Sequence, residues 1–256
     1  MKIRWLTVFL DLAHDPDTAE PFWARVTGTA LSTRRGPDGE FATLLPPHGD
    51  AYLRVQRVRS EAGGCHLDLH VDPDALDNAA ARAVDLGARE RFREAGEVIV
   101  LDSPGGFPFC FVPWTGEATV PEPPDLDGAG QSRLDQLCLD VPPHLLDAER
   151  AFWAAVTGWE ARTGSRPEFG FLVRPAGMPV RILFQRLDSD GARVTGHVDF
   201  SSDDRERLAA AHTAAGARTV ATFPMWTTMA DPTGRLYCLT ARDPRTGGLP
   251  QPAPGR

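Results

Sequence analysis

Apolar side chains recur along this chain with two different periods. The segment CHLDLHV at 65–71 alternates apolar and polar residues, which is the period of a strand with one buried face. The segment at 17–26 repeats apolar residues every three or four positions, which is the period of an amphipathic helix. For the first half the two periods predict strands at 5–12, 41–45, 52–58, 65–71, 98–102 and 107–112, and helices at 17–26 and 73–86.

The second half of the chain repeats the first. FWARVTG at 22–28 recurs as FWAAVTG at 152–158, and HLDL at 66–69 recurs as HVDF at 197–200. Five such matches keep the same order, with offsets between 128 and 131 residues, so the chain is a tandem duplication. The pattern of the second copy predicts strands at 134–141 and 197–201 and helices at 146–156 and 205–215.

Two domains and a linker follow from the duplication. Residues 115–132 are rich in Pro, Gly and acidic residues and read as an exposed linker. We therefore place the first domain at 1–114 and the second at 133–243, and expect a disordered tail at 244–256. In each domain the order strand, helix, several strands occurs twice, which is a pair of βαβββ modules. This α+β plan leaves helices on one face of a curved sheet and a cup on the other.

Composition narrows the class of partner. The net charge of −8 argues against nucleic acid and anionic membranes, which attract basic surfaces. No apolar run reaches the length of a membrane span, and the N-terminal strand lacks the features of a secretion signal. The four cysteines are widely spaced, without a CxxC pair, as expected for reduced thiols in the cytoplasm. Abundant Arg, Ala, Gly and Pro indicate a GC-rich genome.

Three kinds of segment, each present twice, resemble a known family. They are the FW helix with its Thr-Gly end, the histidine strands HLDLHVD and HVDFSSDD, and the closing segments DSPGGFPFCFV and ADPTGRLYCLT. With these segments the chain resembles the vicinal-oxygen-chelate (VOC) superfamily of glyoxalase I, extradiol dioxygenases and fosfomycin and bleomycin resistance proteins, and in particular its glyoxalase-like domain proteins. The resemblance implies two tandem VOC domains packed as an internal pseudo-dimer, with further homodimerisation left open. The fold alone does not fix an activity, because it carries many chemistries.

Enzymes of this superfamily hold a divalent metal in the cup, and the resemblance assigns four ligand positions to each copy. In the first and second copy these positions fall on Thr7 and Gln136, Gln56 and Gln185, His66 and His197, and Pro108 and Leu236. Proline and leucine side chains do not coordinate metals, which leaves one histidine per domain where a catalytic site needs about three protein ligands. We therefore predict no metal and no other cofactor, the alternative being a degenerate divalent-metal site.

Strand alternation assigns a polar set of side chains to each cup. His66 and Asp68 share one face of their strand, as do His197 and Asp199 in the second copy. Either histidine is a candidate ligand anchor or general base, the alternative being a structural histidine held by its neighbouring Asp. The full set of candidate ligand-binding residues is Thr7, Gln56, His66, Asp68, Gln136, Gln185, His197, Asp199 and Trp226.

Three functional hypotheses are consistent with the sequence. The first is metal-free binding of a small hydrophobic metabolite or drug, as in resistance proteins that sequester their ligand. The second is a VOC-type lyase, isomerase or dioxygenase with a degenerate or absent metal site and His66 or His197 as base. The third is a scaffold without a ligand. In the first two the partner is a small molecule, and neither nucleic acid nor membrane is expected as a partner.

Overall fold

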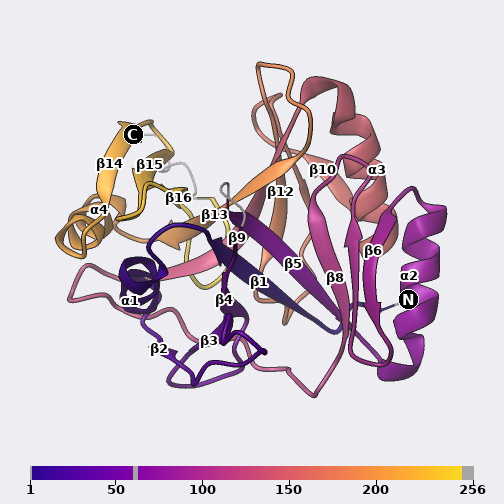
Figure 1. The fold of residues 1–256 in the computed structure, drawn as a ribbon. Coiled ribbons are helices and arrows are strands. Elements are labelled where there is room, and N and C mark those ends of the chain that lie inside the picture. The colour runs from indigo at the N-terminus through magenta and orange to yellow at the C-terminus, as the bar shows by residue number, and fades with distance from the viewer. Residues whose placement is uncertain (1, 60–62, 250–256) are drawn as a thin grey trace.

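In the part of the chain that the structure describes, two eight-stranded sheets combine with four α-helices (Figure 1). The structure is a computed structural model that describes residues 2–59 and 63–249. The first domain consists of β1 (Trp5–Leu12), α1 (Pro16–Val26), β2 (Ala30–Leu31), β3 (Phe41–Leu45), β4 (Leu53–Arg57), β5 (Gly64–Val71), α2 (Leu76–Asp85), β6 (Arg89–Glu94), β7 (Val98–Asp102) and β8 (Pro108–Pro113).

The second domain repeats this order element by element. It consists of β9 (Ser132–Val141), α3 (Leu146–Thr157), β10 (Ala161–Thr163), β11 (Phe169–Leu172), β12 (Arg181–Arg186), β13 (Thr195–Ser202), α4 (Arg205–Ala214), β14 (Arg218–Thr222), β15 (Trp226–Ala230) and β16 (Leu236–Thr240). The sheet orders are β2-β3-β4-β1-β5-β8-β7-β6 and β10-β11-β12-β9-β13-β16-β15-β14, which are the same order in the two copies. Two tandem α+β domains, each of two modules, are thus confirmed.

The central strands have one apolar and one polar face, as their alternation predicts. In β5 the side chains of Leu67, Leu69 and Val71 are fully buried in the core. The other face of β5, with His66 and Asp68, lines the inside of the curved sheet. The edge strand β6 was not located from the sequence, because its six residues, RERFRE, are all exposed and carry no apolar alternation.

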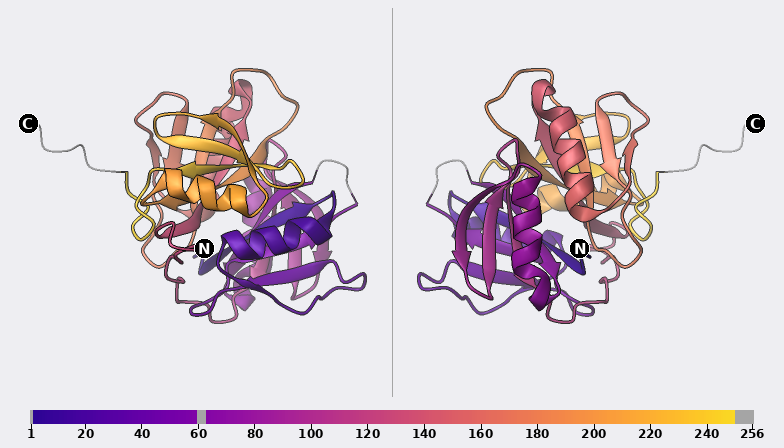
Figure 2. Two further views of the ribbon diagram at one scale, coloured as in Figure 1. Left: turned by 90° about the vertical axis from the view of Figure 1, so that its left-hand side faces the viewer. Right: turned by 90° about the vertical axis from the view of Figure 1, so that its right-hand side faces the viewer.

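Helices of the two domains lie in pairs, α1 beside α4 and α2 beside α3 (Figure 2). Trp23 of α1 stacks on Phe200 of the second domain at 6.5 Å between ring centroids. At the equivalent place Trp153 of α3 meets Phe109 of the first domain at 5.1 Å. Both tryptophans are fully buried. The repeated Phe-Trp segment therefore packs each domain against the other.

The segments outside the two sheets also contact them. Between β8 and β9 the chain forms an isolated bridge from Asp125 to Gln131. After β16 the backbone carbonyl of Arg245 accepts a hydrogen bond from Arg133 at 3.2 Å. The last part of the predicted tail, 250–256, lies outside the described residues. Within residues 2–59 and 63–249 no helix combines the length and apolar character needed to cross a membrane.

Candidate functional site

A cavity of about 300 Å³ occupies the cup of the second domain. Side chains from β9, β11, β12, β13, β15 and β16 line it. All the candidate residues that the sequence analysis named in the second copy are among them, namely Gln136, Gln185, His197, Asp199 and Trp226. The candidates of the first copy do not line this cavity. We call it the second cup.

Aromatic and aliphatic side chains form one wall of the second cup. Phe169 meets Trp226 edge to face at 6.0 Å, and the Arg166 guanidinium lies over the same indole at 5.6 Å. Phe171 carries the Arg181 guanidinium over its ring at 5.2 Å. This wall suits a flat apolar molecule, because aromatic faces stack on planar ligands and exclude water from them.

His197 lies on the polar side of the second cup, between two carboxylates. Its Nδ1 is 2.8 Å from Asp140 Oδ2, and its Nε2 is 3.4 Å from Asp199 Oδ1. Burial lowers the pKa of His197, but Cys138 and the two carboxylates outweigh it and raise the pKa well above its ordinary value. As an imidazolium, His197 donates from both ring nitrogens, so the carboxylates favour a hydrogen-bond donor or general acid over a base.

Gln136 connects the polar groups of the second cup. Its side-chain amide donates to Asp199, and its amide oxygen accepts from Arg181 Nε at 2.8 Å. Both the amide and Asp199 are almost fully buried. Because each member holds the next, the polar side of the cup is fixed before any ligand arrives.

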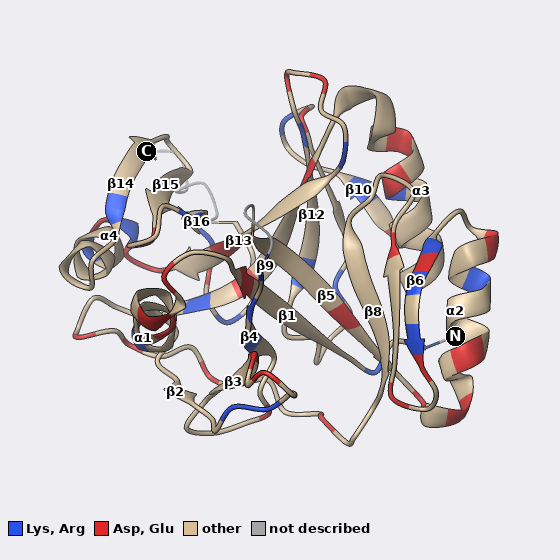
Figure 3. Ribbon diagram, viewed as in Figure 1, with Lys and Arg blue, Asp and Glu red and all other residues tan. Residues whose placement is uncertain are grey.

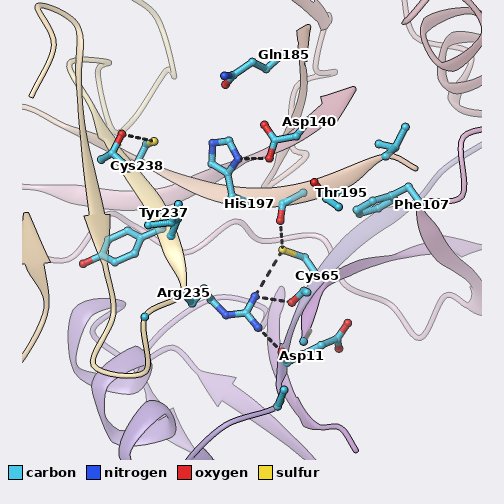
Figure 4. A pocket seen from close by; sticks show the side chains of 18 of the residues that line it. Asp11, Cys65, Phe107, Asp140, Gln185, Thr195, His197, Arg235, Tyr237 and Cys238 are labelled. Atoms are coloured by element: carbon cyan, nitrogen blue, oxygen red, sulfur yellow. Dashed lines mark hydrogen bonds and ion pairs between the residues drawn. The ribbon is translucent and has the colours of Figure 1, made fainter. Parts of the chain in front are cut away.

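A larger cavity of about 730 Å³ lies between the two domains and shares His197, Gln185 and Trp226 with the second cup. Figure 4 shows His197 with its bond to Asp140 on one side of this interdomain cavity and Arg235 on the other. Arg235 donates to the carbonyl of Gly64 at 2.5 Å and to that of Asp11, both in the first domain. The imidazole of His197 is therefore reachable from two sides.

The first cup is filled by the protein's own side chains. His66 Nδ1 donates to Asp11 Oδ1 at 2.9 Å, and its ring stacks on Phe9 at 4.2 Å between ring centroids. The guanidinium of Arg54 lies over the Phe9 ring, 5.6 Å from its centroid, and 3.8 Å from the Asp68 carboxylate. Burial lowers the pKa of His66, but the Asp11 carboxylate outweighs this effect, so the pKa lies above its ordinary value.

Thr7 and Gln56, two further predicted residues of the first copy, contact other residues of the same domain. Thr7 Oγ1 is 2.9 Å from His70 Nε2, and both side chains are buried. Gln56 pairs with Asp11 and Phe41 in the sheet. The two copies of the candidate set thus have different surroundings, although three of the pairs, Gln56 and Gln185, His66 and His197, and Asp68 and Asp199, match in sequence.

Strand register explains why the second cup is open. Leu183 of β12 occupies the position of Arg54 in β4, and Cys138 of β9 that of Phe9 in β1. Each exchange replaces a large side chain with a smaller one on the cup face. The cavity therefore results from two substitutions that distinguish the copies.

A possible metal-ligand group in each cup includes residues that the sequence analysis missed. His66, Asp68 and Cys110 in the first domain, and the trio Cys138, His197 and Asp199 in the second, bring one donor atom each within 4.8 Å of one another. The expected ligand position on the final strand, Leu236, offers no donor. The thiols could have been found from sequence only by pairing the strands, since Cys138 adjoins His197 across the ladder.

The donor set of the second domain fits a borderline divalent ion such as Zn²⁺ by type. Imidazole, thiolate and carboxylate are its usual ligands. Asp140 orients His197 from behind, as carboxylates do for metal-bound histidines, and Asp199 Oδ1 has no hydrogen-bond partner in the described chain. Metal binding has to displace a proton from Cys138, because burial raises the pKa of this thiol to about 12.

Comparisons with known proteins place both halves of the chain in one family. The profile of the family described as "Glyoxalase-like domain" matches residues 7–112 and 136–240. The Mn(II)-bound glyoxalase from Novosphingobium aromaticivorans is 18% identical with a TM-score of 0.64, over 98% of this chain and 88% of that one. No curated protein sequence matches the chain.

Extradiol-type dioxygenases have the same fold. The 2,2',3-trihydroxybiphenyl 1,2-dioxygenase from Sphingomonas wittichii strain RW1 is 14% identical with a TM-score of 0.61, over 93% of this chain and 89% of that one. The 2,3-dioxygenase LapB from Pseudomonas sp. KL28 is 13% identical with a TM-score of 0.61, over 92% and 90%. At these identities the likeness shows a shared VOC-type fold, and the family profile extends over both cups. The chain therefore belongs to the glyoxalase-like domain family, of which it carries two tandem copies.

Proposed function

We propose that this protein binds a small, flat, largely apolar molecule in the second cup, without a resident metal. The cavity of about 300 Å³ in the second cup is the observation that carries the proposal. Its volume is at the lower end of the range of about 300–1,000 Å³ found for small-molecule sites. Phe169, Phe171 and Trp226 supply the apolar contact, and the polar groups opposite fix the orientation.

The polar side of the cup limits which ligands fit. His197 and Gln136 are engaged with Asp140, Asp199 and Arg181, so a ligand meets donors whose orientation is preset. His197 Nε2 lies 3.4 Å from Asp199 Oδ1, which has no hydrogen-bond partner among the described residues, so a hydroxyl on the ligand would accept from His197 Nε2 or donate to Asp199 Oδ1. A purely hydrocarbon ligand would leave this buried carboxylate oxygen without a partner, at a cost of about 1–3 kcal/mol.

A second candidate function is a metal-dependent VOC enzyme, which the trio Cys138, His197 and Asp199 favours. A relative of the same fold is a Mn(II)-bound glyoxalase, and others are dioxygenases. A divalent ion at the trio would act as a Lewis acid on a substrate oxygen. The role of the chain's own residues would be to hold His197 through Asp140, to stack the substrate on Trp226 and to exclude water.

The proposal is tested by titrating purified protein with 2-naphthol, a neutral planar molecule with one hydroxyl, in a calorimeter. We expect saturable binding at one site. Leu183→Arg places the arginine of the first cup into the second and is expected to weaken binding at least tenfold, because the side chain occupies the space of the ligand. Leu86→Arg, the same change at an exposed leucine, is the matched control and is expected to bind as the wild type does.

Metal analysis of the same preparation separates the two candidate functions. Near-stoichiometric Zn, Fe, Mn or Ni that is lost in His197→Ala would contradict metal-free binding and support the enzyme. Absence of 2-naphthol binding up to millimolar concentration, or equal binding by Leu183→Arg with unchanged far-UV circular dichroism, would contradict ligand binding in the second cup. Unfolding curves of each variant show whether a loss reflects the site or the fold.

A further inference from the structure

A cavity of about 710 Å³ adjoins the second cup, and five arginines are among the residues that line it. Its walls come from the segment 118–120 before β9, the loop 173–178 and the segment 245–248 after β16. Phe171, Arg181 and Arg242 line both this cavity and the second cup. We call it the arginine pocket, and its charged lining residues are Arg133, Asp135, Arg174, Arg181, Arg242 and Arg245.

A single carboxylate faces four buried or half-buried guanidinium groups in the arginine pocket. Asp135 is fully buried and pairs with Arg242 through contacts of 2.5 and 3.0 Å. Arg174 reaches the same carboxylate only at 3.9 Å. The fifth arginine, Arg245, is exposed and pairs with Glu122. Four positive charges against one negative charge leave an excess of three, in a protein whose net charge is −8.

Two of the four guanidinium groups have no acidic partner among the described residues. Arg133 donates only to backbone carbonyls, of Pro121 at 3.4 Å and Arg245 at 3.2 Å, and its Nε has no partner there. The side chain of Arg133 is more than nine-tenths buried. Arg181 donates to the Gln136 amide oxygen alone. A buried charge without a counter-charge destabilises the fold unless something else neutralises it.

A β-bulge brings the carboxylate into this cluster. In the second domain Asp199 pairs with Gln136 and Phe200 with Leu134, so Asp135 is an extra residue in β9. In the first domain the equivalent pairs, Asp68 with Thr7 and Leu69 with Leu6, are continuous. Bulges of this kind re-aim side chains and are frequent next to functional sites.

The first copy has aromatic residues where the second has arginines. By strand register Arg133 corresponds to Trp5, Arg181 to Tyr52 and Arg242 to Trp114. Trp5 and Tyr52 are buried and close that end of the first cup. The first domain thus shows that aromatic residues at these positions are compatible with a stable fold. Three changes from aromatic to arginine at one end of one cup point to a ligand and not to packing.

We propose that the arginine pocket binds an oxyanion, a phosphate or carboxylate group carried by a small molecule. The planar guanidinium fork matches both groups through paired hydrogen bonds. Bound there, the anion would offset part of the excess charge and supply acceptors for Arg133 Nε and for the free donors of Arg181 and Arg174. This site adjoins the second cup and shares Phe171, Arg181 and Arg242 with it, but its anion-binding groups are the guanidinium groups, so it does not depend on the apolar ligand proposed above.

Thermal unfolding in inorganic phosphate, in acetate and in chloride, at equal ionic strength and pH, tests the site. We expect phosphate, acetate or both to raise the Tm above the value in chloride, because a ligand of the folded state alone stabilises it. A rise in phosphate alone assigns a phosphate group, and a rise in acetate alone a carboxylate. Arg174→Gln and Arg181→Gln are expected to weaken anion binding about tenfold each, since each removes a charge-assisted hydrogen bond.

Two further variants keep the test decisive. Arg162→Gln removes an equal charge from an exposed arginine of the same domain, paired with Glu160, and is expected to keep the full response. Asp135→Asn removes the competing carboxylate, so its Tm in chloride falls and its gain in the active anion exceeds that of the wild type. Equal Tm values in all three anions, or an unchanged response in Arg174→Gln and Arg181→Gln, would overturn the proposal. Failure here leaves 2-naphthol binding unaffected, because that probe is neutral.

Discussion

Three histidines, His66, His197 and His212, occupy two opposite electrostatic settings. His66 and His197 each contact a carboxylate, and their pKa values are raised. His212 of α4 is fully buried, and its one hydrogen-bond partner among the described residues is the Tyr237 hydroxyl, at 2.8 Å from its Nδ1. Burial without a counter-charge lowers the pKa of His212 from 6.5 to about 3. The folded protein therefore holds His212 as a neutral side chain at every physiological pH.

Acid should destabilise the protein through His212. The unfolded chain protonates this residue near pH 6.5 whereas the folded chain does so near 3, so the unfolded state binds more protons between these values. The free energy of unfolding then falls as the pH falls from 6.5, with a slope of at most about 1.4 kcal/mol per pH unit from this group. His212→Gln is expected to flatten that slope in urea unfolding at several pH values. His144→Gln, at an exposed histidine, should retain it, and identical slopes for the wild type and His212→Gln would contradict this account.

For single residues the sequence predicts which face of the strand a side chain lies on better than it predicts whether a cavity is open beside it. Alternation along β5 and β13 correctly places His66, Asp68, His197 and Asp199 on the cup faces. Whether a cup is open depends on residues from a neighbouring strand, Arg54 in one copy and Leu183 in the other. Their cross-strand relation is not visible without the register. The same limit hid the grouping of Cys138 with His197.

Each of the two contacts between the domains contains one buried carboxylate, which lies on a helix in one contact and on a turn in the other. Glu149 of α3 accepts from Ser103 Oγ at 2.9 Å, from the Gly105 amide, and from Trp153 Nε1 at 2.8 Å. At the equivalent contact the carboxylate belongs to the turn instead, and Asp231 accepts from Trp23 Nε1 at 3.0 Å. In both contacts a buried indole N–H from the repeated Phe-Trp segment finds an acceptor.

Removing either carboxylate should destabilise the fold strongly. Glu149→Ala leaves three buried donors without an acceptor, so we expect a loss of about 3 kcal/mol or more in the free energy of unfolding. Asp231→Ala leaves Trp23 Nε1 and the amides of Thr233 and Arg235 in the same condition. Urea unfolding measures both losses. Asp147→Asn, an exposed acid of the same helix, is the control and should change the value by less than about 0.5 kcal/mol.

Edge strands are the elements that sequence reasoning identified least well. Figure 3 shows β6 carrying both acidic and basic residues along its length. Arg93 pairs with Glu90 of the same strand at 2.7 Å and also with Asp77 of α2. Charges on an exposed edge discourage pairing with another chain. Such a strand has no buried face to leave an apolar pattern, so hydrophobic periodicity cannot reveal it.

Across the whole molecule the two domains share one core. Glu149 joins the second domain to a turn of the first, and Trp23 joins the first domain to a turn of the second. The aromatic contacts of Trp23 with Phe200 and of Trp153 with Phe109 lie beside these bonds. The tandem repeat predicted two domains correctly. It could not predict that the most regular part of the repeat serves the contact between them, because identical sequence is equally compatible with packing inside each copy.

Shared packing predicts that the chain unfolds as one unit. We expect a single transition in urea, coincident by tryptophan fluorescence and by far-UV circular dichroism, although the chain has two domains. Asp231→Ala should move this transition as a whole to lower urea concentration. Two resolved transitions, with only one of them shifted by Asp231→Ala, would show that the domains unfold independently.

The different positions of this carboxylate in the two contacts also bear on the ancestry of the chain. A single-copy ancestor with the same interface would have formed a symmetric homodimer, in which every residue occurs on both sides of the twofold axis. In such a dimer the acid could not be on the helix at one contact and on the turn at the other. Glu149 and Asp231 could diverge only after gene duplication had made the two copies genetically independent. Duplication thus released each contact, and each cup, from the requirement to match its counterpart.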